Sequence, residues 1–182
     1  MPGANPGMMA KDRKAQRDAR PFGLPLRHPA VMLATWFGAG LLPAAPGTWG
    51  SLAALPFAWA ICALWGTVGL AIAAATVFIA GWWAAGALAA ASGTKDPGAI
   101  VIDEVAAQWL VLLAVPLDPL AYALALLLFR IFDIWKPWPV CWADRHIAGG
   151  LGIMLDDLMA AVYAVLVLSA LLAIGGAFGV RR

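Results

Sequence analysis

Apolar residues dominate the chain in long runs that short groups of turn residues separate. No charged side chain occurs in residues 29–94, although a single crossing of the hydrocarbon core needs only about 20 residues. Because that core offers no water to unpaired backbone groups, such runs are expected to be helical. Helices are predicted at residues 50–66, 67–91, 104–116, 119–135 and 157–178. The pattern therefore predicts an all-α, multi-pass helical membrane bundle.

Glycine, proline and small polar residues mark the ends of the predicted helices. Gly66 separates the first two apolar runs, and proline or glycine recurs in each later break. The segment 29–43 is interrupted by Gly38, Gly40 and Pro43. We expect this segment to form a half-inserted helix that does not cross the bilayer.

Composition supports a membrane protein with a short soluble tail. The chain is 63% hydrophobic and 12% charged, whereas a soluble domain has about 45–50% and about 25%. Residues 1–28 are predicted to form a basic N-terminal tail, and residues 29–180 a helical membrane domain. The net charge of +2 is small and scattered, so no nucleic-acid partner is expected. Basic residues just ahead of an apolar region instead favour an anionic membrane surface.

The order of the predicted crossings determines which loops share a side of the membrane. Two crossings separate the loop around Gly47 from the loop around Lys95, and two more separate Lys95 from Lys136. These loops therefore face one side, together with most of the lysine and arginine residues. By the positive-inside rule this side is cytoplasmic.

Carboxylates and basic residues gather in those same loops. Charged groups within or beside apolar helices are costly, which makes them functional candidates. The simpler interpretation is that they anchor or cap helix ends. The catalytic candidates are Asp103, Glu104, Asp133 and Asp156. The candidate metal ligands are Asp103, Glu104, Asp133, Asp156 and Asp157. An all-oxygen ligand set points to Mg²⁺ rather than to zinc.

The two acidic pairs are each expected to supply one inward-facing carboxylate. Asp103 and Glu104 begin one apolar run, and Asp156 and Asp157 begin another. Neighbouring residues on a helix point about 100° apart. We therefore expect Asp103 to face the shared ion with Glu104 assisting, and Asp156 with Asp157 assisting.

The phosphate-binding candidates are hydroxyl and cationic side chains near the same interface. Thr48 and Ser51 follow Gly47 at the start of a predicted helix, whose free N–H groups attract anions. Glycines in membrane helices also serve close packing, which is the alternative explanation. The cationic candidates are Arg130, Lys136 and Arg145.

Several phosphatase mechanisms lack their required residues in this sequence. Neither Cys62 nor Cys141 is followed six positions later by arginine, and no Asp-x-Asp pair is present. Only His28 and His146 are available as histidine nucleophiles. The mechanism that remains is attack on phosphorus by water that a carboxylate-held metal activates.

Four stretches resemble the phosphatidylglycerophosphatase A family. They are PGTWGSLAALPF at 46–57, GAIVIDE at 98–104, FRIFDIWKPWP at 129–139 and GGLGIMLDD at 149–157, and they occur in the family's order. Gly38, Gly40, Asp144 and Arg145 also match. One position departs from the pattern: Ala148 precedes the paired glycines, where the family often has a histidine, and His146 lies two positions earlier.

The resemblance implies a Mg²⁺-dependent phosphatase of the bacterial inner membrane. It would convert the phospholipid phosphatidylglycerophosphate to phosphatidylglycerol and phosphate. Two other classes would also use buried carboxylates. A CDP-alcohol phosphotransferase would carry an Asp-Gly-x-x-Ala-Arg signature, which is absent. A proton-coupled transporter would place its acids near the bilayer midplane, often in repeated halves, whereas here they lie at segment ends.

Overall fold

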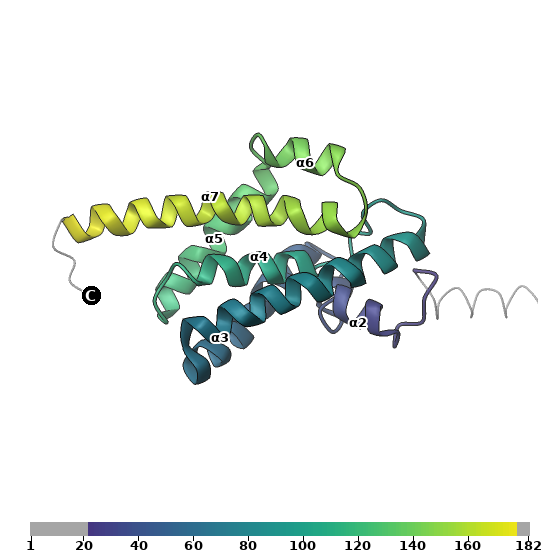
Figure 1. Cartoon of the computed structure of the whole chain (residues 1–182), viewed down its shortest axis with the longest axis horizontal. Helices are drawn as coiled ribbons and strands as arrows, with labels where there is room; N and C mark the ends of the chain where they lie inside the picture. The colour runs from purple at the N-terminus through teal and green to yellow at the C-terminus, as the bar shows by residue number, and fades with distance from the viewer. Residues whose placement is uncertain (1–21, 178–182) are drawn as a thin grey trace, which may run out of the picture.

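The computed structural model describes residues 22–177, and every regular element in that range is helical (Figure 1). The elements are α2 (Pro29–Ala34), the 3₁₀ helix η1 (Ala39–Leu41), α3 (Pro46–Ser92), α4 (Ile102–Leu112), α5 (Pro119–Trp135), α6 (Val140–His146) and α7 (Gly149–Ala177). The all-α class is confirmed. Residues 1–21 of the predicted tail lie outside the described range, and the division at residue 28 stays a prediction.

Helix α3 is a hairpin of two arms that reverse direction at Gly66. This residue has φ 66° and ψ −170°, a conformation that only glycine adopts readily. In a straight helix Gly50 and Gly81 would lie about 45 Å apart at 1.5 Å per residue. Instead Gly50 lies against Val101 and Gly81 against Ile102, two consecutive residues at the start of α4. The break predicted at Gly66 is therefore confirmed.

Small residues allow the long helices to pack closely around α4, which contacts both α3 and α7 (Figure 1). A Cβ atom added to Gly81 would lie 2.9 Å from Met154 on α7. Gly150, in the first turn of α7, lies directly against the backbone of Trp82 and Gly86. Glycine and alanine at helix contacts favour this backbone approach, so the packing sets the position of α7 along α3.

Two helices in the described range are long and apolar enough to cross a membrane, Pro46–Ser92 and residues 149–173 of α7. Many large apolar side chains of α3 are exposed, among them Val68 at 72% and Ile79 at 66%. Contiguous exposed apolar surface of this kind marks an interaction site or a lipid contact. Helices α4 and α5 have only 11 and 17 residues, so the multi-pass bundle stays a prediction.

The helix boundaries differ from the predicted ones in three places. Segment 29–43 contains only α2 and η1, both too short to cross a bilayer. Helix α6 was not predicted, because its seven residues lie among prolines and charged residues. Helix α7 begins at Gly149 rather than at residue 157. The prediction that Asp156 and Asp157 begin a helix is therefore wrong. They lie about two turns inside α7, where no capping role explains them.

Candidate active site

A polar cavity of about 200 Å³ lies where the ends of several helices meet. Its walls come from the start of α3, the loop before α4, the first turn of α4, the end of α5 and the third turn of α7. The lining residues are Ala45, Pro46, Gly47, Asp96, Gly98, Ile100, Asp103, Glu104, Arg130, Asp133, Lys136, Asp156 and Asp157. The four carboxylates predicted as catalytic, and all five predicted metal ligands, thus share one cavity.

Asp103, Glu104 and Asp157 form the closest group of carboxylates in the cavity. Each offers an oxygen, and the three oxygens lie within 4.8 Å of one another. Asp157 is only 4% exposed. One oxygen of each residue is buried without a hydrogen-bond partner, a costly state that a bound cation would relieve.

This triad corrects the prediction that only one residue of each acidic pair faces a shared ion. Asp103 and Glu104 are neighbours in the first turn of α4, yet both contribute to the triad. The two side chains leave the helix about 100° apart. The glutamate side chain is longer than an aspartate, so its carboxylate can still reach the other two carboxylates of the triad. On α7, Asp157 belongs to the triad, and Asp156 instead forms an ion pair with the Lys136 side chain.

Gly47 provides the space that Glu104 and Arg130 occupy beside the start of α3. A Cβ atom at residue 47 would clash with Glu104 Oε1 and would lie 3.0 Å from Arg130 Nη1. Only a residue without a side chain allows this approach. The glycine of the predicted phosphate cradle therefore serves to bring α3 against the charged side chains of α4 and α5.

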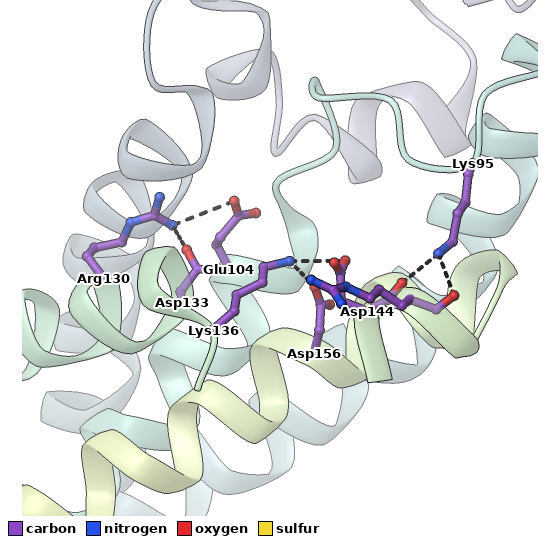
Figure 2. A network of polar contacts seen from close by, with 8 residues as sticks. Lys95, Glu104, Arg130, Asp133, Lys136, Asp144 and Asp156 are labelled. Carbon is purple, nitrogen blue, oxygen red and sulfur yellow. Dashed lines mark hydrogen bonds and ion pairs between the residues drawn. The ribbon is translucent and has the colours of Figure 1, made fainter. Parts of the chain in front are cut away.

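Arg130 and Asp133, three residues apart on α5, share a face as predicted. The Arg130 Nη1 atom lies 2.6 Å from Asp133 Oδ2 and 3.7 Å from Glu104 Oε1 (Figure 2). The Arg130 side chain is only 15% exposed. The ion pairs with Asp133 and Glu104 hold the guanidinium in place. Its Nε is buried without a partner, so the guanidinium keeps donor capacity for an anion.

Lys136 joins the end of α5 to α6 and α7. Its Nζ lies 2.6 Å from Asp156 Oδ2 and 3.1 Å from Asp144 Oδ1 (Figure 2). Burial lowers the pKa of Lys136, but the hydrogen bonds and charge of Asp156 and Asp144 outweigh it and raise the pKa above its usual range. The ammonium group therefore stays charged. Lys95 Nζ donates to the backbone carbonyls of Asp144 and Arg145 at the end of α6.

Three predicted phosphate-binding residues lie outside the cavity lining. Thr48 and Arg145 are exposed. The Ser51 hydroxyl is buried and donates to the backbone oxygen of Gly47 at 2.9 Å, which is a helical hydrogen bond rather than a free donor. Their predicted phosphate contacts are without support in this geometry. His146 also lies away from the cavity, stacked on Trp142.

Asp96 is a lining residue that was not among the predicted site residues. It belongs to the loop before α4, and burial raises its pKa even though Lys136 acts in the opposite direction. The sequence signal that could have identified Asp96 as a site residue is its position next to the Pro97-Gly98 turn. A tight turn just before a buried helix keeps its charged residue close to the first turn of that helix.

The charges of the cavity suit a bound cation. Six carboxylates line it against two cationic side chains. Like charges this close repel strongly in a partly buried site. The ligand atoms of the triad are all oxygens, the type that Mg²⁺ and similar hard cations prefer. The residues present therefore fit a divalent metal ion.

The fold and the cavity together define an all-helical protein with membrane-length apolar helices and an acidic site suited to a metal ion. Comparison with known proteins identifies the family. The family model for phosphatidylglycerophosphatase A matches residues 32–172, and the chain belongs to this family. Its sequence is 38% identical to phosphatidylglycerophosphatase A of Escherichia coli (strain K12), over 80% of this chain and 85% of that protein.

Two further relatives cover most of the chain. Phosphatidylglycerophosphatase A of Haemophilus influenzae is 40% identical over 80% of this chain and 90% of its own length. A Bacteroides thetaiotaomicron protein named as a candidate phosphatidylinositol-3-phosphatase is 39% identical over 82% of this chain and 94% of its own. No solved structure matches the chain.

Proposed function

We propose that this protein hydrolyses phosphatidylglycerophosphate to phosphatidylglycerol and inorganic phosphate, and that it uses Mg²⁺. The observation that carries the proposal is the triad of Asp103, Glu104 and Asp157 beside Arg130 in one cavity. Membership of the phosphatidylglycerophosphatase A family supplies the substrate. The carboxylates within the four matching stretches, Asp103, Glu104, Asp133, Asp156 and Asp157, all line the cavity.

The charge balance supports a cation requirement. A phosphate monoester carries about two negative charges at neutral pH, and it would enter a cavity with four more carboxylates than cations. Repulsion would exclude it unless positive charge were added. Asp103, Glu104 and Asp157 would hold the ion. When bound, Mg²⁺ supplies charge stabilisation to the phosphoryl oxygens and acidity to the nucleophilic water.

The remaining residues position the phosphate. The Arg130 guanidinium, fixed by Asp133, would donate to phosphoryl oxygens as a planar fork. Lys136 would add a second cationic donor while Asp156 orients it. In the reaction the water oxygen forms a bond to phosphorus, the bond between phosphorus and the glycerol oxygen breaks, and one proton of the water is balanced by the proton that the released glycerol hydroxyl takes up. Developing negative charge then lies between groups that are already oriented, which lowers the barrier.

We further propose that the protein crosses the bacterial inner membrane several times with the cavity at the cytoplasmic face. Lys95, Lys136 and Arg145 are brought to one region by the contacts of Asp144 and its neighbours. The tryptophans near this region, Trp135, Trp138 and Trp142, are exposed. Basic residues and tryptophan at one end of apolar helices are typical of a cytoplasmic membrane interface.

Phosphate release by the purified protein in detergent tests the function. We expect release from phosphatidylglycerophosphate with Mg²⁺, none with EDTA, and recovery when Mg²⁺ is restored. Phosphatidylinositol 3-phosphate serves as the comparison substrate because one relative carries that activity in its name. Absence of release from phosphatidylglycerophosphate with any divalent cation would refute the proposed function. Faster release from the inositol lipid would reassign the substrate.

A further inference from the structure

A second cavity, an open apolar groove, lies between the first arm of α3 and helix α5. Its volume is about 480 Å³, within the range of about 300–1,000 Å³ that is usual for small-molecule sites. The side chains of the lining are apolar apart from the Trp59 indole N–H and the Tyr122 hydroxyl. The lining residues are Leu52, Leu55, Pro56, Trp59, Pro119, Tyr122, Ala123 and Leu126.

The groove begins next to the charged cavity. On α5, Leu126 of the groove precedes Arg130 of the cavity by four residues, which places both on one face about 6 Å apart along the axis. On α3, Leu52 follows Gly47 of the cavity by five residues. The same two helices therefore form the wall of the charged cavity and then the walls of the groove.

Two contacts join the helices that form the walls of the groove. At the cavity end, Arg130 lies against Gly47. At the far end, the rings of Trp59 and Tyr122 meet edge to face with centroids 5.1 Å apart. Between these contacts the small residues Pro56 and Ala123 line the groove.

We propose that this groove holds an acyl chain of the lipid substrate while the phosphate of the same molecule lies in the charged cavity. The inference rests on the proposed function. A lipid phosphate is the ligand with an anionic end and an apolar end joined in one molecule. The two sites offer the matching surfaces in the same order along α5, cationic at Arg130 and apolar from Leu126 to Pro119.

The groove contributes to orientation more than to affinity. A chain that moves from the bilayer into an apolar groove leaves one apolar environment for another, so burial from water does not drive the step. A chain held between two helices does limit the rotation of the lipid about its phosphate. Orientation of this kind affects turnover strongly, because a misplacement of about 1 Å can cost about a hundredfold in rate.

Photolabelling tests the occupant directly. The full-length protein in bilayer nanodiscs with Mg²⁺ is irradiated with a non-hydrolysable phosphonate analogue of phosphatidylglycerophosphate that carries a diazirine within one acyl chain, and the labelled residues are mapped by mass spectrometry. Phosphatidylcholine with the same diazirine reports bulk lipid. We expect the phosphonate lipid to enrich labelling of 52–59 and 119–126 over 61–73 at the hairpin tip. Equal distributions for the two lipids would overturn the inference.

A groove-filling variant gives an independent test. Ala123→Phe narrows the groove, and Ala75→Phe on the second arm of α3, which is exposed and lines none of the described cavities, is the matched control. The quantity measured is the ratio of kcat/KM for dioleoyl to dihexanoyl phosphatidylglycerophosphate. We expect Ala123→Phe to lower this ratio at least about tenfold through misplacement of the phosphate, and Ala75→Phe to leave it unchanged.

The possible results separate the inference from the proposed function. An unchanged ratio in Ala123→Phe, with normal wild-type activity, would overturn the groove assignment and leave the phosphatase function intact. An inactive wild-type protein that still shows enriched groove labelling would refute the phosphatase function and retain the lipid-phosphate site.

Discussion

Asp157→Asn is expected to weaken the response of the protein to Mg²⁺ strongly without harming its fold. Asparagine keeps the size of the side chain and removes one of the three anionic ligands of the triad. Removal of one partner from a buried charge pair costs about 3–5 kcal/mol, which corresponds to at least about a hundredfold weaker cation binding. At a Mg²⁺ concentration below the wild-type Kd, turnover should fall by a comparable factor.

The stability response gives the prediction a second readout. At a Mg²⁺ concentration of about 100 times Kd, the wild-type protein gains about 2.7 kcal/mol. After a hundredfold or larger loss of affinity, the variant gains only about 0.4 kcal/mol or less. For a chain of this length 1 kcal/mol corresponds to about 2–4 °C in Tm. Mg²⁺ should therefore raise the wild-type Tm by about 5–11 °C, and the variant Tm by about 1–2 °C at most.

In EDTA the sign of the effect should reverse. Without a cation, the Asp157 carboxylate is buried among other carboxylates, so its replacement relieves repulsion, and the variant should be at least as stable as the wild type. Thermal unfolding in detergent, scanned over Mg²⁺ concentration, measures both effects. Asp118→Asn is the matched control, since Asp118 only caps α5 through Ala121 N and asparagine caps equally well. Equal Mg²⁺-induced shifts in Asp157→Asn and the wild type would refute the reasoning.

Three further predictions follow from the same geometry. Asp133→Asn releases the guanidinium that it holds at 2.6 Å and should nearly abolish phosphate release, which normal release would contradict. Gly47→Ala inserts a methyl group where two charged side chains lie; activity should be lost with helix content retained by circular dichroism, whereas Gly86→Ala, with only ordinary contacts at 3.6 Å, should stay active. Cysteines at Lys95 and Arg145, in a cysteine-free background, should resist impermeant thiol reagents in intact cells, and labelling of either from outside would disprove the cytoplasmic orientation.

The helices were predictable because apolar runs and turn residues carry a strong local signal. The reversal at Gly66 needed only a glycine between two apolar runs, and it lies where the sequence indicates. The late start predicted for α7 has a physical cause. Residues 149–156 include three glycines and an acidic residue, which disfavour a helix locally, but packing of Gly150 against α3 stabilises the helix there.

The gathering of the acidic residues in one place was predictable, but the contacts among them were not. Parity of the crossings brought the acidic residues to one side, and the structure does gather them in one cavity. The choice between Asp156 and Asp157 as a triad member depends on the rotation of α7. That rotation is set by contacts such as Gly81 with Met154, which join residues far apart in the sequence and leave no local signal.

The position of Asp157 on the last helix has a consequence for synthesis in the cell. Glu104 and Asp103 leave the ribosome more than 50 residues before Asp157, so the nascent chain carries an incomplete set of triad carboxylates until α7 is made. Acidic residues in such a half-built protein are costly in an apolar environment. A chain that stops before α7 lacks Asp156 and Asp157, and with them one oxygen of the triad and the buried partner of Lys136. Docking of α7 is therefore the step of assembly that completes the triad.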